Sequence, residues 1–153
     1  MRCLYLNSPA MVAGMRSCLA AEGLDLTEEI AKGSLILTSD RSHLTDGKFE
    51  VNKMINLLHA TLQQALADGY TALWATGDMT WEFGNKSNLD KLLDYERKLE
   101  EFMQKNLSLC GICQYHRDTL PPPAIEVGLH THKAMYINDT LSRLNPDYTL
   151  AVN

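Results

Sequence analysis

Hydrophobic and polar positions along the chain fall into two alternating kinds of segment. Longer stretches with apolar residues three or four positions apart predict helices, most clearly over residues 49–68. Short apolar or β-branched runs predict strands over residues 2–6, 35–38, 71–76 and 107–115, and more weakly over 134–137. Strands that alternate with helices are typical of βαβ units, so the pattern predicts a three-layer α/β domain with a mostly parallel sheet flanked by helices.

Capping residues indicate where the other helices begin and end. Ser8 offers a hydroxyl N-cap and Pro9 suits the first helical position, so a helix is expected from here to about residue 23. Thr27 is the expected cap of a short helix that ends at Gly33. The same signals predict helices over residues 88–106 and 124–130, the second opened by the prolines at 121–123, and a last strand over 147–152.

Composition restricts the class of protein. The chain has 153 residues and a formal net charge of −5, which favours a single domain over residues 1–153 and argues against nucleic acid as a direct partner. No apolar run is long enough for a membrane span or a signal peptide, so we expect a cytoplasmic protein with no membrane partner. In that compartment its four cysteines would stay reduced.

Neither Gly-rich phosphate-binding motif occurs, G-x-x-x-x-G-K-[ST] or G-x-G-x-x-G, and no G-x-S-x-G elbow presents a nucleophilic serine. The polar residues that stand out follow two predicted strands. Asp78 and Trp81 come after one, while Gln114 and Tyr115 end another. Carboxyl ends of parallel strands meet at one edge, where open sheets place their ligand crevices, so these side chains predict a small-molecule pocket. The alternative is a tryptophan that simply fills the sheet edge.

A second hypothesis rests on the cysteines and histidines. Cys110 and Cys113 form a C-x-x-C pair, but the apolar run around them predicts a strand and not the helix N-terminus that lowers a thiol pKa. On a strand the two side chains would point to opposite faces. A metal- or thiol-dependent redox protein therefore remains the alternative function, with candidate ligands Cys110, Cys113, His116, His130 and His132.

Five stretches, in this order and spacing, together resemble one family: RCLYLNSP, GSLILTSDRSHLTDGKFEVNKM, ALADGYTALWATGDMTW, LLDYERKLEEF and LCGICQYHRDTLPP. They are similar to the MEDS domain, a methanogen/methylotroph sensory domain found in a dichloromethane-responsive regulator and in many histidine kinases and response regulators. The resemblance covers about residues 2–137. It implies a RecA-like core without a Walker A loop, and a domain that senses small organic molecules without catalysis or cofactor.

The resemblance also implies which positions matter. The matching residues are Gly77, Asp78, Met79, Trp81, Tyr95, Glu96, Cys113, Gln114, Tyr115 and Arg117. From these we expect a ligand-binding set of Asp78, Trp81, Tyr95, Glu96, Gln114 and Tyr115, with no catalytic residue and no metal. Trp81 and Tyr115 would form aromatic walls and the others would orient the ligand. His116 departs from the family pattern, because many members have Asp at this position.

The start of the chain is a second departure. Family members usually begin with a further strand and helix before the segment at residues 2–6, and the phosphate loop of the ATPase relatives belongs to that unit. Its loss would leave a gap inside a RecA-like sheet, with unpaired backbone groups on either side. We expect the tail at 139–153, and its predicted strand in particular, to fill the gap within the chain or by exchange in a homodimer. The domain would then transmit its signal through self-association or through a separate signalling protein.

Overall fold

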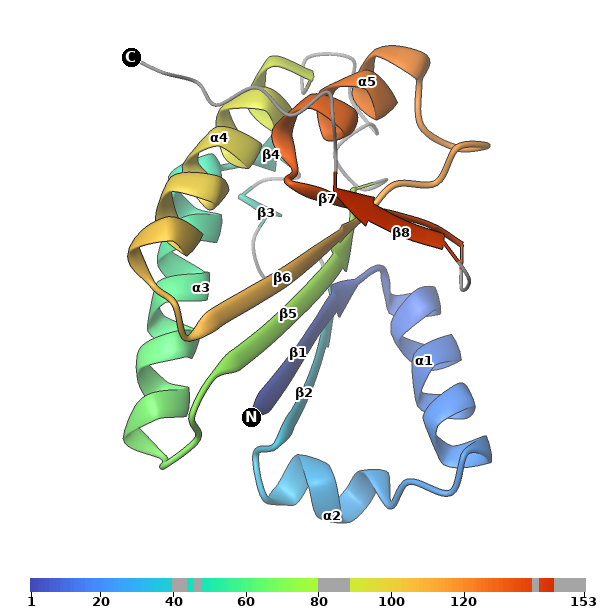
Figure 1. Ribbon diagram of the computed structural model, residues 1–153. Helices are drawn as coiled ribbons and strands as arrows, with labels where there is room; N and C mark the ends of the chain where they lie inside the picture. Colours follow the sequence, from blue (N-terminus) through green and yellow to red (C-terminus); the bar gives the residue numbers. More distant parts are fainter. Residues whose placement is uncertain (40–43, 46–47, 80–88, 139–140, 145–153) are drawn as a thin grey trace.

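The computed structural model describes residues 1–39, 44–45, 48–79, 89–138 and 141–144 (Figure 1). Its strands are β1 (Arg2–Asn7), β2 (Leu35–Ser39), β3 (Leu44–Thr45), β4 (Lys48–Phe49), β5 (Leu73–Asp78), β6 (Leu109–Gln114), β7 (Ala134–Asn138) and β8 (Leu141–Leu144). Its helices are α1 (Pro9–Ala21), α2 (Leu26–Ala31), α3 (Val51–Ala67), α4 (Leu89–Lys105) and α5 (Pro122–Thr131). The expected α/β class is confirmed.

Four parallel strands form the main sheet, in the order β2-β1-β5-β6. Strand β1 pairs with β2 on one side and with β5 on the other, as in a doubly wound sheet whose strand order reverses beside the first strand. The predicted gap inside the sheet is therefore wrong for these strands, because β1 and β5 hydrogen-bond directly to each other. The expected strand over 147–152 lies outside the described residues.

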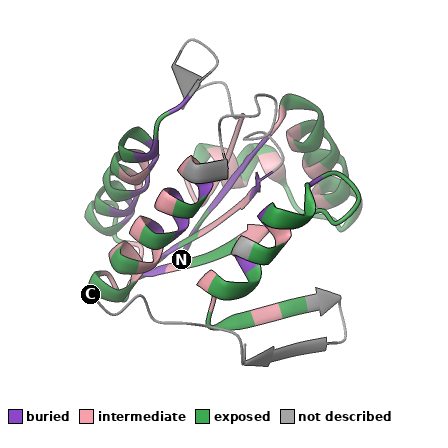
Figure 2. Cartoon of the chain, turned by 90° about the horizontal axis from the view of Figure 1, so that it is seen from above, coloured by how far each residue is buried: buried purple, intermediate pink, exposed green. Residues whose placement is uncertain are grey.

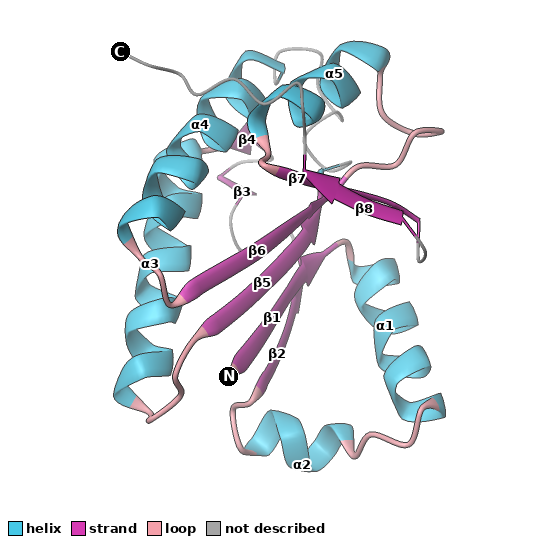
Figure 3. Ribbon diagram, viewed as in Figure 1, coloured by secondary structure: helices cyan, strands magenta, loops and turns pink. Residues whose placement is uncertain are grey.

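Two small hairpins lie outside this sheet (Figure 3). Strand β7 covers the weaker strand predicted over residues 134–137, but it pairs antiparallel with β8 and does not join the parallel sheet. Strand β8 falls within the segment 139–153 that was expected as a tail. Strand β4 takes up Phe49, so the predicted helix over 49–68 begins two residues later.

Helices cover both faces of the sheet, which gives the three expected layers (Figures 1 and 3). Helices α3 and α4 pack on one face and on each other, and α5 packs against α4. Their inward sides carry most of the buried residues (Figure 2). Helices α1 and α2 contact mainly β1 and β2 on the other face, and no residue of α1 is buried. The two faces of the sheet are thus covered to very different extents.

The helix ends follow local hydrogen bonds. Ser8 caps α1 as expected, with its hydroxyl accepting from the backbone N–H of Met11. The cap of α2 is Asp25 and not Thr27, because the Asp25 carboxylate accepts from the N–H of Glu28 at 3.0 Å. An aspartate directly before the first helical residue is an equally good cap, so Thr27 lies inside α2. Gly33 follows α2 with φ of 71°, a backbone angle that favours glycine.

Among the described helices, none combines the length and the apolar character needed to cross a lipid bilayer.

Candidate functional site

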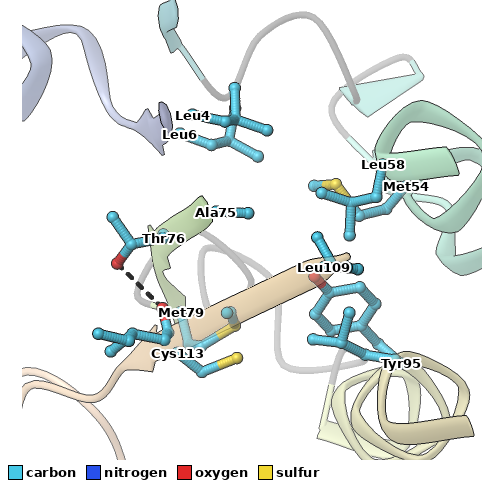
Figure 4. A pocket seen from close by; sticks show the side chains of 14 residues that line it. Leu4, Leu6, Met54, Leu58, Ala75, Thr76, Met79, Tyr95, Leu109 and Cys113 are labelled. Atoms are coloured by element: carbon cyan, nitrogen blue, oxygen red, sulfur yellow. Dashed lines mark hydrogen bonds between the residues drawn. The ribbon is translucent and has the colours of Figure 1, made fainter. Parts of the chain in front are cut away.

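A cavity lies between the sheet and the helices α3 and α4 (Figure 4). The volume open to the centre of a water molecule is about 40 Å³, which exceeds what a single water needs. Its wall is mainly apolar and consists of Leu4, Leu6, Met54, Leu58, Ala75, Thr76, Gly77, Met79, Tyr95, Leu99, Leu109, Gly111, Ile112 and Cys113. The walls come from three strands and two helices, so the cavity exists only in the folded chain.

The periodicities of strand and helix explain this wall. Alternate residues of a strand face the same side, which directs Leu109, Gly111 and Cys113 of β6 toward α3 and α4. On α4, Tyr95 and Leu99 are four residues apart and share the face that meets them. Gly111 contributes no side chain, and a Cβ added there would lie 3.5 Å from the nearest atoms of Met103. Small residues at the sheet thus leave the space that larger ones would fill.

A polar cluster adjoins the cavity at Cys113. Glu96 of α4 follows Tyr95, and its carboxylate is fully buried. The hydroxyl of Tyr115 donates a hydrogen bond to Glu96 Oε1. The other oxygen, Oε2, lies 3.6 Å from Cys113 Sγ and 3.4 Å from His132 Nε2. We call Glu96, Cys113, Tyr115 and His132 the Glu96 cluster. Cys113 belongs both to this cluster and to the cavity wall.

Three elements bring the Glu96 cluster together. Cys113 and Tyr115 alternate along β6 and its continuation, so both face α4, which carries Glu96. His132 is the residue at the carboxyl end of α5. Gly128 on α5 allows this helix to approach, because a Cβ there would lie 2.8 Å from the Tyr115 ring. Replacing this glycine would push α5, and His132 with it, away from the cluster.

The electrostatics of His132 reflect its neighbours. Burial lowers the pKa of its imidazole, but the contact with Glu96 and the charges of Glu96 and Glu100 raise it more, so the pKa lies above its usual value of 6.5. Lys133 forms an ion pair with Glu100 at 3.4 Å, so a second positive charge lies beside one of these two carboxylates. A protonated His132 supplies the positive charge that a buried carboxylate such as Glu96 requires.

The residues expected from sequence as one ligand set divide between the two faces of the sheet. Tyr95 lines the cavity, and Glu96 is hydrogen-bonded to Tyr115 on the same side. Asp78 and Gln114 are partners in the register of β5 and β6, as the strand-end argument expected. However, both alternate with cavity-lining residues and so face away from α3 and α4. Trp81 lies outside the described residues.

On that second face the strand ends carry a polar cluster of their own. His116 Nε2 lies 3.6 Å from the buried Asp78 carboxylate, and Gln114 donates to Thr76 Oγ1 at 3.1 Å. Asn7 donates to the hydroxyl of Tyr5 at 2.9 Å. Burial raises the pKa of Tyr5, the bond from Asn7 lowers it, and the charge of Asp78 raises it further, with a net increase. These bonds join the strand ends to one another.

The candidate metal ligands are likewise only partly assembled. Cys113 and His132 come together, with Glu96 as a third possible ligand that the predicted metal-ligand set did not include. Cys110 points to the opposite face of β6. His116 contacts Asp78 on that face, and His130 is exposed on α5. The expected set of five does not form one site.

Sequence reasoning missed most of the cavity wall. Residues such as Leu4, Met54 and Leu58 read as ordinary core positions, since each has the spacing of a buried strand or helix face. One available signal was the alternation along β6, which separates Cys113 and Tyr115 from Gln114. A second was Glu96 on the apolar face of α4, next to Tyr95, where a charged residue requires a partner.

Comparison with known proteins identifies one family. The family model described as "MEDS: MEthanogen/methylotroph, DcmR Sensory domain" matches residues 1–133. No curated protein and no solved structure matches the chain significantly.

Proposed function

We propose, on the premise that this chain belongs to the MEDS family of sensory domains, that it senses a small organic molecule bound in the cavity between the sheet and helices α3 and α4. The observation that carries the proposal is the cavity itself. It is apolar over most of its wall and has a few residues with a hydroxyl or thiol, Thr76, Tyr95 and Cys113, which is the usual composition of small-molecule sites.

The size of the cavity limits the ligand. Its volume of about 40 Å³ is well below the roughly 150 Å³ of an engineered cavity that holds benzene. A molecule with one or two carbon atoms and an apolar surface fits these dimensions. The Cys113 thiol lines the cavity, and the Glu96 carboxylate and the His132 imidazole lie behind it. These groups would orient any polar or polarisable atom of that molecule.

The Glu96 cluster offers a route from the cavity to the surface. Cys113 contacts the cavity, Glu96 belongs to α4, and His132 lies at the junction of α5 and β7. A ligand that prefers one arrangement of these elements would shift the population toward it, since only differential affinity can move such an equilibrium. We propose that the shift is transmitted through a homodimer or to a separate signalling protein, for transcriptional or other regulation. A RecA-like origin of the sheet remains a prediction.

Thermal unfolding in the presence of small organic compounds tests the proposal. Dichloromethane serves as the apolar probe and methanol as a smaller, polar probe that the cavity also has room for. A ligand that binds only the folded protein stabilises it by RT ln(1 + [L]/Kd), or about 2.7 kcal/mol at 100 times its Kd. We expect dichloromethane to raise the melting temperature in a saturable manner, whereas methanol has little effect.

Two substitutions reduce the cavity. Gly111→Ala and Ala75→Val both add carbon atoms to its wall, so each is expected to diminish the stabilisation by dichloromethane. Cys110→Ala is the matched control, since it alters the same strand on the opposite face and should leave the stabilisation unchanged. An equal response in all variants, or no saturable response in the native chain, would rule out this cavity as the sensory site.

Thiol redox chemistry has less support than the cavity. Cys110 and Cys113 are free and point to opposite faces of β6, so they are not placed to form a disulfide with each other. Metal binding is a separate question, because it involves Cys113 without Cys110.

A further inference from the structure

We propose that Glu96, Cys113 and His132 form a binding site for a divalent transition-metal ion of the zinc type, a property distinct from the sensing of an organic molecule. One ligand atom from each residue lies within 4.8 Å of the other two. Thiolate, imidazole and carboxylate are the three ligand types that zinc takes in proteins. The residues come from α4, β6 and the end of α5, so the fold assembles them from distant parts of the sequence.

The distances suit a shared metal ion. Zinc lies about 2.3 Å from sulfur and about 2.0–2.2 Å from nitrogen or oxygen, in tetrahedral geometry. Tetrahedral angles then place a nitrogen and an oxygen ligand about 3.4 Å apart, and a sulfur and an oxygen ligand about 3.6 Å apart. The corresponding separations from Glu96 Oε2 are 3.4 Å to His132 Nε2 and 3.6 Å to Cys113 Sγ.

The surroundings also suit a cation. Metal-binding carboxylates are commonly held by a second hydrogen bond, and the Tyr115 hydroxyl donates one to Glu96 Oε1. A buried carboxylate needs a compensating positive charge, which a divalent ion supplies. With the thiol ionised and the imidazole neutral, the charges of the ion, Glu96 and Cys113 sum to zero. Binding therefore releases the thiol proton, and any imidazole proton, to solvent.

Three protein ligands leave one tetrahedral position open, as in zinc sites that bind an exchangeable water. Cys113 also lines the cavity, so this site adjoins the space assigned to the organic ligand. The two sites share a wall but are independent hypotheses. A metal can bind without an organic ligand, and dichloromethane can bind without a metal.

Cobalt spectroscopy provides the direct test. Co²⁺ replaces zinc in such sites, and a cobalt–thiolate bond gives an intense charge-transfer band in the near ultraviolet. We expect this band when Co²⁺ is added to the reduced native chain, with saturation at one ion per chain. Cys113→Ser should abolish it, whereas Cys110→Ser, on the other face of the same strand, should retain it.

Zinc affinity, measured by competition with a chromophoric chelator, tests the other ligands. His132→Gln should weaken binding by more than about 100-fold, while the matched control His130→Gln on exposed α5 should not. Tyr115→Phe removes only the bond that orients Glu96, so we expect a loss of about 10-fold. Circular dichroism of each variant checks that it is folded. If Cys113→Ser does not fold, the loss of zinc affinity in His132→Gln tests the site in its place.

Two outcomes would overturn the proposal. One is a native chain that gives no thiolate band with Co²⁺ and no measurable competition for Zn²⁺. The other is a band that survives in Cys113→Ser, because the metal would then be bound by exposed thiols such as Cys3 or Cys18. Neither outcome bears on the dichloromethane experiment, so failure here and failure of the sensory cavity can be told apart.

Discussion

The two faces of the parallel sheet differ sharply, although the same strands make both. The face toward α3 and α4 carries the buried core, the cavity and the Glu96 cluster. On the other face, α1 and α2 lie mainly against β1 and β2, and Trp74 of β5 is 42% exposed. Knowing which strand a residue belongs to therefore does not show whether it is near the cavity. The position of a residue, odd or even along its strand, decides which environment it enters.

The largest contrast is expected from truncating one apolar residue on each face of β6. Leu109→Ala removes a buried side chain from the cavity face and should cost about 2–5 kcal/mol of unfolding free energy. Cys110→Ala alters the opposite face, where the side chain is only partly buried, and should cost about 1 kcal/mol or less. Urea unfolding followed by circular dichroism measures both. Equal costs would show that the second face is covered in solution, for instance by another copy of the chain.

A smaller effect is expected from the hydroxyl that holds Glu96. Tyr115→Phe removes a hydrogen bond to a buried carboxylate, a kind of bond that contributes about 1.5–3 kcal/mol. Tyr136→Phe is the matched control, because this tyrosine is 71% exposed on β7 and its change should be close to neutral. Both are measured by urea unfolding. If the two variants were equally stable, the Glu96 cluster would contribute nothing to folding.

The pH dependence of the unfolding free energy tests His132 on the cavity face against a residue on the other face. A chelator is present in these measurements, so that no bound metal ion contributes. The pKa of His132 is raised in the folded chain, so its stabilising contribution is complete below the unfolded value of 6.5 and is lost as pH rises through the folded value. Glu96 and Glu100 face this imidazole from α4, Cys113 faces it from β6, Tyr115 faces it from the residue after β6, and Lys133 is its neighbour in the chain.

The native chain should therefore lose stability relative to a His132→Gln variant as the pH rises above 6.5. His116→Gln on the second face is the control, since its ring is half exposed beside Asp78. Thermal unfolding at a series of pH values gives the comparison. A native chain whose stability rises over this range relative to His132→Gln would contradict the assigned direction of the pKa shift.

The smallest effect on stability is expected at the cavity itself. Gly111→Ala adds a Cβ at ordinary contact distance from Met103 and Ala75, so the unfolding free energy should change by less than about 1 kcal/mol, with a gain favoured. Gly77→Ala is a useful contrast, because its Cβ would lie 3.0 Å from the carbonyl oxygen of Leu6 and should be destabilising. Urea unfolding distinguishes the two. A large loss at Gly111 would mean that no free space exists there.

Several elements followed directly from local sequence. Ser8 and Pro9 predicted the start of α1, and the apolar spacing of α3 predicted its buried residues Met54, Leu58 and Leu62. The strands of the parallel sheet were each found to within about two residues. These predictions depend on neighbours in the chain, so the sequence contains all the information they need.

The site was predicted less well. Asp78 and Gln114 do meet at one sheet edge, and Glu96 does meet Tyr115, but these pairs lie on opposite faces. The prediction was wrong because it put Gln114 and Tyr115 in the same pocket, although adjacent residues of a strand point to opposite faces of the sheet. The weaker strand predicted over 134–137 exists as β7, but its antiparallel partner β8 was not predicted from the sequence.

The sequence by itself determined the α/β class, most element boundaries and the membership of the MEDS family, because these follow from short-range periodicity, capping and the order of motifs. Only the tertiary structure decided the strand order, the cavity and the meeting of Glu96, Cys113 and His132. The reason is physical. A cavity and a cluster of ligands depend on the packing of helices against strands that are far apart in sequence, and local patterns carry no record of those distances.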